Sequence, residues 1–233
     1  MAKWHFWGEK SFADVYENIY IRTKVEDWFK IVFSIVDEIN KLKGKKSKIL
    51  DIGCGEGHTT KQILDRIKGD YICDLLEPDK KAIDIGKSFL RSENKIGEIF
   101  ETTLAQLYTN KKYDIVFTSH TNYYWAANEK DYNEQLKKLT TLTKNNGKIL
   151  ILTLPKNSDH YNIAVKKVYP KYIYSEFIAK FYQKIGLKVN VKRFKMRMFV
   201  GDILSTGNKF DLKTFYKFIH NTDSYPSDLE SAN

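Results

Sequence analysis

The residues best suited to chemistry form a short glycine run in the first third of the chain. The run DIGCGEG at residues 51–57 directly follows the apolar pair Ile49 and Leu50 and directly precedes a helical pattern. Glycine permits backbone conformations and close ligand approach that any side chain would block, and the end of the first strand is where an open α/β sheet binds ligands. A loop of this kind can hold a cofactor of the adenosine type.

The spacing of the glycines weighs against two common nucleotide sites. Gly53, Gly55 and Gly57 form the alternation G-x-G-x-G, whereas the dinucleotide fingerprint wants its third glycine at the position of His58. A phosphate-binding P-loop requires Gly-Lys-Ser/Thr after the loop, and that sequence does not follow here. The remaining alternative is a tight strand-to-helix turn that binds nothing.

An acidic residue follows where a ribose would need it. Twenty residues after Gly57, the apolar run at 71–76 ends in Glu77-Pro78-Asp79. A carboxylate at the tip of the second strand can accept hydrogen bonds from both hydroxyls of an adenosine ribose. Asp79 is better explained as the cap of the helix that begins there.

Polar and aromatic side chains gather after the apolar run at 113–119. They are Ser119, His120, Thr121, Asn122, Tyr123, Tyr124 and Trp125. Aromatic faces attract a positively charged nitrogen, and an imidazole can orient a nucleophile or accept its proton. The mixture favours a small amine as substrate, with Tyr123 and Tyr124 as binding residues and His120 as the catalytic group. The alternatives are core filling by Tyr124 and Trp125, and a histidine that only hydrogen-bonds the backbone.

The N-terminal segment supplies further substrate-binding candidates. Its first twenty residues are rich in aromatics, which is typical of a segment folded over something, so we expect a lid that includes Tyr16 and Tyr20. Thr23 and Glu26 have the spacing of a capping box at the start of a helix. Glu26 is also a weaker candidate for holding the cationic end of a substrate.

Short apolar runs alternate with amphipathic stretches from Lys48 onward, as in a parallel sheet with crossover helices. Strands are predicted at 48–52, 71–77, 98–102, 113–119 and 148–154, with a sixth near 187–191. Helices are predicted at about 24–42, 58–67, 79–91, 131–143, 173–185 and 211–219, and the third crossover is only a short turn. The fold class is therefore α/β, a Rossmann-like, doubly wound, mostly parallel sheet with an N-terminal lid and a C-terminal helical cap.

The end of the sheet requires a separate prediction. The apolar positions switch phase near Arg193, so a bulge or break is expected there. The polar stretch before Asn233 contains no alternating apolar run. We therefore expect part of 194–203 to pair beside the fifth or sixth strand, because a missing last strand would leave an unpaired edge.

Length and composition favour one folded unit. A chain of 233 residues with 42% hydrophobic residues can bury one substantial core, which we divide into a lid and helix at 1–45, a cofactor-binding core at 46–155 and a substrate-side cap at 156–233. There is no apolar run of membrane-spanning length and no signal-peptide pattern. The two cysteines, Cys54 and Cys73, suit free thiols with no metal site, so a cytoplasmic protein without a membrane span is expected.

The formal charge of +10 is concentrated late in the chain. Residues 156–197 hold eleven Lys or Arg against Asp159 and Glu176, a local balance of +9. Such a face can attract RNA, a membrane surface or an acidic substrate, although a solvated surface is the commoner explanation.

Three segments together resemble a known family. ILDIGCGEG and LLEPD resemble the first two motifs of class I S-adenosylmethionine-dependent methyltransferases, and NNGKILIL resembles the start of their fifth strand. Over about 180 residues the chain is also similar to the histamine N-methyltransferase branch, in the EPD turn, YDIVFTSHTNYYW, SEFIAKFYQKIGLKV and FDLKTFYKFI. It departs from that branch at His120, where an amide is usual, so the substrate of the branch is not carried over.

The resemblance implies S-adenosylmethionine as cofactor and a role for each matching position. Gly53, Gly55 and Gly57 would lie against its methionine part, and Asp51, which opens the loop, would be a further cofactor-binding residue. Glu77 would bind ribose, Thr103 and Leu104 would lie near adenine, and Ser119 and His120 would face the methyl group. For Thr103 and Leu104, ordinary packing at a strand-to-turn junction is an equal alternative.

The resulting function is a methyltransferase acting on a nitrogen of a small amine or imidazole-type molecule. One alternative is a methyltransferase that reaches RNA or protein through the basic segment 156–197, although the Asn/Asp-Pro-Pro-Tyr-type motif of such enzymes is absent after the fourth strand. Another is a cofactor-binding subunit without catalysis. The sequence leaves the oligomeric state open.

Overall fold

Five parallel strands form the central sheet in a computed structural model that describes residues 24–25, 28–42, 46–90, 95–126, 128–158, 174–194 and 198–199. The strands are β2 (Ser47–Ile52), β3 (Tyr71–Leu76), β4 (Ile96–Phe100), β5 (Tyr113–Ser119) and β6 (Thr143–Leu152). Their order across the sheet is β4-β3-β2-β5-β6, and every neighbouring pair is parallel. After β2 the chain adds β3 and β4 on one side of β2 and then β5 and β6 on its other side. Open α/β sheets bind ligands at such a reversal of strand order.

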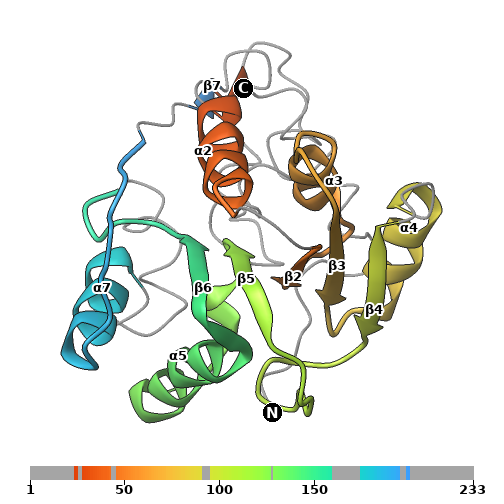
Figure 1. The fold of residues 1–233 in the computed structure, drawn as a ribbon. Helices are drawn as coiled ribbons and strands as arrows, with labels where there is room; N and C mark the ends of the chain where they lie inside the picture. Colours follow the sequence, from red (N-terminus) through yellow and green to blue (C-terminus); the bar gives the residue numbers. More distant parts are fainter. Residues whose placement is uncertain are drawn as a thin grey trace, which may run out of the picture.

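Helices cover both faces of this sheet. They are α2 (Trp28–Asn40), α3 (His58–Leu64), α4 (Lys80–Leu90), α5 (Glu129–Leu142) and α7 (Ser175–Lys184). Figure 1 shows α2 and α3 on one side of the sheet and α5 on the other. The connection from β4 to β5 contains turns but no helix, as predicted. The doubly wound, Rossmann-like fold that the sequence predicted is confirmed.

Successive residues of β2 show why the sheet needs both helical layers. Ile49 packs into a core cluster with Val32 of α2 and Ile63 of α3, whereas Leu50 packs on the opposite face with Leu139 of α5. Side chains alternate between the two faces of a strand, so a strand with apolar residues at consecutive positions, as at Ile49 and Leu50, must be covered on both faces. The helical layers on both faces of the sheet therefore explain the consecutive apolar residues of β2.

The structure confirms the predicted cap at Asp79 and shows how α7 ends. The carboxylate of Asp79 accepts hydrogen bonds from the N–H groups of Lys81 and Ala82 at 2.9 and 3.3 Å, which caps the start of α4. After α7, Gly186 has φ of +84° and the N–H of Leu187 donates to the carbonyl oxygen of Tyr182 at 2.9 Å. This 6→1 bond is the Schellman ending that glycine permits.

The sixth strand predicted near 187–191 is wrong. Residues 187–194 follow α7 without forming a strand. The N–H of Leu187 is used to end the helix, and the side chains of Leu187 and Val191 are 42% and 51% exposed. Alternating apolar residues form a strand only where one face is buried, and these residues lack that burial.

The segment predicted to complete the sheet pairs elsewhere in its described part. β7 (Met198–Phe199) is antiparallel to β1 (Lys24–Val25) and forms a separate two-stranded sheet near the start of α2 (Figure 1). The prediction that 194–203 would pair beside the fifth or sixth strand is wrong for these two residues. The same pairing explains why the helix predicted from residue 24 begins at Trp28.

Several predictions fall on residues that the structure does not describe. The aromatic lid at 1–20, the capping box at Thr23 and Glu26, and the helix at 211–219 lie outside the described residues. The division at 1–45, 46–155 and 156–233 stays a prediction for the same reason. Within the described ranges, no helix has the length and apolar character needed to cross a membrane.

Candidate functional site

Three glycines shape the loop between β2 and α3. Gly53, Gly55 and Gly57 have φ of +71°, +55° and +81°, a region in which a side chain is strained. A Cβ on Gly53 would lie 2.5 Å from Cγ2 of Thr121, and one on Gly57 would overlap Leu90. A Cβ on Gly55 would meet nothing within 4 Å. Side chains therefore pack against Gly53 and Gly57, while Gly55 borders open space that a ligand can enter.

Glu77 directly follows β3, and its carboxylate lies against this loop. Oε2 accepts a hydrogen bond from the N–H of Gly55, and Oε1 accepts one from the N–H of Asp79, each at 3.0 Å. Burial raises the pKa of Glu77, while the hydrogen bonds from these two N–H groups oppose the rise. An ionised carboxylate has about four lone-pair sites, so both oxygens keep acceptor capacity. The structure brings Glu77 and Gly55 together, and ribose binding by Glu77 stays a prediction.

Asp51 points into the protein. Its side chain is 3% exposed, and Oδ2 accepts a hydrogen bond from the hydroxyl of Thr60 at 2.6 Å. Burial raises the pKa of Asp51 to about 7, the bond from Thr60 lowers it, and the negative charge of Glu77 raises it. The Asp51–Thr60 bond joins the end of β2 to the first turn of α3 and so holds the loop in shape. Direct contact of this side chain with a cofactor stays a prediction.

The two residues predicted to lie near adenine follow β4. Leu104 is 3% exposed and packs in the core cluster with Leu50 and Leu76, so its side chain has the packing role that was its alternative. The hydroxyl of Thr103 hydrogen-bonds Oε1 of Gln106 at 3.0 Å and accepts from the N–H of Gln106 at 3.3 Å. Thr103 thus shapes the turn after β4, and contact of either residue with adenine stays a prediction.

The exit of β5 meets the glycine loop through Thr121, a member of the polar group after 113–119 for which the sequence predicted no role of its own. Thr121 donates from Oγ1 to the carbonyl oxygen of Ile52 at 3.2 Å, and its side chain occupies the space against Gly53. Thr118 lies three residues earlier, with its Oγ1 2.6 Å from that of Thr121. Two threonines at this spacing on a predicted strand end are the only sequence signal for this contact, and that signal is weak.

Ser119 and His120 lie directly before Thr121 and so reach the edge of the sheet beside the loop. Ser119 is half-buried and pairs in register with Leu152 of β6. Nδ1 of His120 is 2.5 Å from the phenol oxygen of Tyr123. The structure therefore brings His120 together with Tyr123.

The predicted aromatic pocket is partly core. Tyr123 is 7% exposed and packs with Tyr132 and Leu136, and the half-buried Tyr124 and Trp125 border the same cluster. The rings of Tyr123 and Tyr124 meet edge to face, with centroids 5.7 Å apart. Core filling, the alternative for Tyr124 and Trp125, accounts for part of their surface. The other predicted substrate residues, Tyr16, Tyr20 and Glu26, lie outside the described residues.

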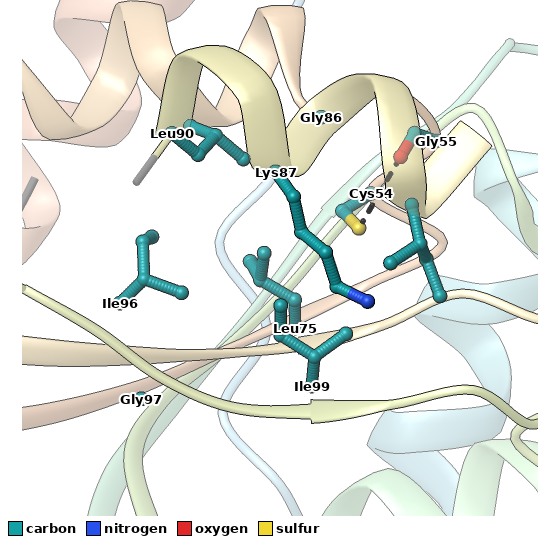
Figure 2. Close-up of a pocket in the computed structure, with 10 residues that line it drawn as sticks. Cys54, Gly55, Leu75, Gly86, Lys87, Leu90, Ile96, Gly97 and Ile99 are labelled. Atoms are coloured by element: carbon teal, nitrogen blue, oxygen red, sulfur yellow. Dashed lines mark hydrogen bonds between the residues drawn. The ribbon is translucent and has the colours of Figure 1, made fainter. Parts of the chain in front are cut away.

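A cavity of about 410 Å³ lies between α4 and the strands β3 and β4. Figure 2 shows Leu75, Leu90 and other apolar side chains around it, with the sulfur of Cys54 close to the carbonyl oxygen of Gly55. Burial raises the pKa of Cys54 well above its usual value, so the thiol stays protonated, and both cysteines of the chain are free, as predicted. The cavity borders Cys54 and Gly55 of the glycine loop and Lys87 of α4, and Glu77 is not among its lining residues. Cofactor binding at the glycine loop stays a prediction.

Residues 49–147 match a protein-family model described as a methyltransferase domain. The matched segment contains the glycine loop, Glu77 and the exit of β5. This segment of the chain is therefore similar to a methyltransferase domain. No curated protein matches the chain.

Solved structures of methyltransferases have a similar fold. An S-adenosylmethionine-dependent methyltransferase from Clostridium acetobutylicum ATCC 824 is 16% identical, with a TM-score of 0.50 over 65% of this chain and 58% of that one. N-methyltransferase NodS from Bradyrhizobium japonicum WM9, in complex with S-adenosyl-L-homocysteine, is 13% identical, with a TM-score of 0.54 over 73% and 85%. An O-methyltransferase family protein from Burkholderia thailandensis is 19% identical, with a TM-score of 0.54 over 71% and 53%.

These likenesses show the class I methyltransferase fold. The chain spans less than two thirds of the Clostridium and Burkholderia proteins. Proteins with N-methyltransferase and O-methyltransferase in their names share the fold, so the fold alone does not determine the acceptor atom.

The residues of the methyltransferase domain fit S-adenosylmethionine. Gly55 leaves open space beside the loop, where a side chain would intrude on a ligand. Glu77 offers remaining acceptor capacity to two hydroxyls, next to a backbone N–H that already fixes its orientation. The turn from β5, with His120 at its start, lies against the same loop through Thr121 and Gly53. A nucleoside and a reacting methyl group therefore each have suitable residues at this edge of the sheet.

Proposed function

We propose that the chain is an S-adenosylmethionine-dependent methyltransferase that methylates a nitrogen of a small amine or imidazole-type molecule. The observation that carries the proposal is the Glu77 carboxylate hydrogen-bonded to Gly55, at the ligand-binding edge of the sheet and beside the polar exit of β5. The NodS structure supports the cofactor, since that N-methyltransferase of similar fold holds S-adenosyl-L-homocysteine.

Positioning is the main task of the protein in this reaction. S-adenosylmethionine supplies an already activated methyl group on a sulfonium, so its leaving group needs no acid catalysis. Holding two reactants in line can account for roughly 7–11 kcal/mol of the barrier. A nitrogen acceptor must present a neutral lone pair and afterwards lose a proton, and we assign the acceptance of that proton to His120.

Two features support nitrogen and a small acceptor. Tyr124 and Trp125 are half-buried aromatics close to His120 in the chain, and aromatic faces attract cationic nitrogen. The similarity of several segments to the histamine N-methyltransferase branch points the same way.

Free thiols at Cys54 and Cys73 suit a reducing compartment, so a cytoplasmic location is part of the proposal.

Two measurements in sequence test the proposal. Isothermal titration with S-adenosylmethionine should show binding to the full chain, and a mass-spectrometric screen of small amines and imidazoles should then reveal a methylated product. Matched alcohols, in which a hydroxyl replaces the amine, are the control. Methylation of the alcohols alone would overturn the nitrogen assignment, and absence of cofactor binding would overturn the activity.

The basic segment supports an alternative acceptor, RNA or protein. Part of its charge is already paired, because Lys192 lies 3.3 Å from Glu38 and 3.0 Å from the hydroxyl of Ser34. A salt-dependent RNA mobility shift combined with methyl transfer to RNA would favour this acceptor over a small amine. Cofactor binding without transfer to any acceptor would indicate a non-catalytic subunit.

A further inference from the structure

His120 has a strained backbone at the exit of β5. Its φ is +53°, and it is the one non-glycine residue with positive φ in the part of the chain that the structure describes. Such conformations persist only where the surroundings enforce them, and they concentrate at functional sites. The N–H of His120 donates to the carbonyl oxygen of Leu152 at 2.9 Å, which ties the turn to β6. Contacts with β6 and with the glycine loop therefore both fix the turn that orients the imidazole.

Tyr123 is itself fixed where it meets this imidazole. It lies in the 3-10 helix Asn122–Tyr124, is 7% exposed and packs among Tyr132 and Leu136. Its phenol oxygen is 2.5 Å from Nδ1 of His120. The ring of Tyr123 is held by this packing, and its phenol oxygen already lies against the imidazole. A fixed partner for the imidazole is therefore a better explanation of this hydroxyl than the substrate contact predicted from the sequence.

We propose that Tyr123 is a positioning residue: its phenol oxygen accepts the Nδ1–H of His120, so that Nε2 carries the lone pair that takes the acceptor's proton. This inference rests on the proposed function. A neutral imidazole has one N–H and one lone pair, and the hydrogen bond at one nitrogen selects the state of the other. If Tyr123 instead donated to Nδ1, the hydrogen would lie on Nε2, and Nε2 could not act as a base.

The proton transfer balances with these groups alone. As the acceptor nitrogen bonds to the methyl carbon and the carbon–sulfur bond breaks, that nitrogen becomes positively charged while still carrying its proton. Its N–H bond then breaks, the electron pair stays on nitrogen, and the proton bonds to the lone pair of Nε2. The resulting imidazolium donates from Nδ1 to the phenol oxygen, and a charged donor makes a stronger hydrogen bond than a neutral one. Tyr123 thus orients the ring before the transfer and stabilises it afterwards.

The tautomer of His120 tests this inference without any methyl transfer. Long-range proton–nitrogen NMR spectra of the nitrogen-15-labelled full chain report which ring nitrogen carries hydrogen, and the His120 signals are identified by their loss in His120→Gln. We expect hydrogen on Nδ1 in the natural protein and a shift toward hydrogen on Nε2 in Tyr123→Phe. Tyr182→Phe is the matched control, because it removes a phenol of the same core cluster that hydrogen-bonds Leu136 instead.

Kinetics supply the second readout. Tyr123→Phe should lower kcat about tenfold and leave the Kd for S-adenosylmethionine within about twofold, whereas Tyr182→Phe should change neither. Hydrogen on Nε2 in the natural protein, or an unchanged tautomer in Tyr123→Phe, would overturn the inference. An equal loss of kcat in Tyr182→Phe would also overturn it, because lost packing would then explain the effect. A chain that keeps the expected tautomer but methylates nothing would overturn the proposed function and leave the role of Tyr123 in holding the ring intact.

Discussion

The two halves of the candidate site use different chemical groups. At the exits of β2 and β3, the site consists of glycine backbone and one carboxylate, which meet through the Gly55 N–H and Glu77. At the exit of β5, it consists of side chains, with the imidazole of His120 bonded to the phenol of Tyr123. A site made of backbone groups depends on the shape of the fold itself, whereas side chains can be replaced with little change to the fold. The cofactor half should therefore tolerate substitution poorly, and the acceptor half should tolerate it structurally while losing activity.

The largest effect is expected at Gly53. Gly53→Ala combines left-handed strain with overlap against Thr121, which together should lower the free energy of unfolding by about 3 kcal/mol. Gly69→Ala is the matched control, since Gly69 also has positive φ, +103°, but has open space at the Cβ position. Urea denaturation of both variants measures the difference. Equal losses would mean that the contact between the loop and Thr121 contributes nothing, and the two halves would then be independent.

His120 should show the opposite behaviour, a large loss of rate with little loss of structure. Asparagine tolerates positive φ, so His120→Asn should fold normally while lacking a proton acceptor. We expect kcat to fall about a hundredfold, the lower end of what a positioned general base contributes, with an almost unchanged Kd for S-adenosylmethionine. Steady-state kinetics and titration separate the two quantities. A Kd that weakens as much as kcat falls would place His120 on the cofactor rather than on the acceptor.

Glu77 should give a smaller effect that is confined to the cofactor. Glu77→Ala removes the charge-assisted hydrogen bonds proposed for both ribose hydroxyls, so binding of S-adenosylmethionine should weaken at least tenfold, about 1.4 kcal/mol. Glu134→Ala, at an exposed glutamate of α5 that pairs with Lys137, is the control. Titration of both variants checks the result, and unchanged affinity in a folded Glu77→Ala would remove the ribose assignment.

This contrast also explains which features could be predicted from the sequence. The strand β5, the cap at Asp79 and the meeting of Glu77 with the glycine loop follow from apolar runs and short spacings, because parallel strands bring their carboxyl ends to one edge. The Tyr123–His120 bond, the Thr121 contact and the inward turn of Asp51 depend on side-chain directions that periodicity does not encode. The sixth strand was wrong because Leu187 and Val191 alternate as a strand would, yet lack a partner face to bury them.

The smallest expected effect on cofactor binding is at Asp51, whose side chain is buried and hydrogen-bonded to Thr60. The pKa of Asp51 is raised to about 7 in the folded chain, above the 3.8 of an unperturbed aspartate. Between these values the folded state holds a proton that the unfolded state has lost, so stability from this group is complete below pH 4 and falls as pH rises to 7. One such group changes the free energy of unfolding by about 1.4 kcal/mol per pH unit within that window.

Asp51→Asn should remove this slope, because an amide does not titrate while its oxygen can still accept the hydrogen bond from Thr60. Urea denaturation at several pH values from 4 to 8 measures the slope for both chains, and the variant should be the more stable one near pH 8. The same variant sharpens the comparison between the two halves of the site. Because Asp51 is 3% exposed and hydrogen-bonded inward, the Kd of Asp51→Asn for S-adenosylmethionine should differ from that of the natural protein by less than about threefold. This is well below the loss of affinity expected for Glu77→Ala. A tenfold weaker Kd with an unchanged pH slope would instead place the Asp51 carboxylate on the cofactor, as the sequence predicted.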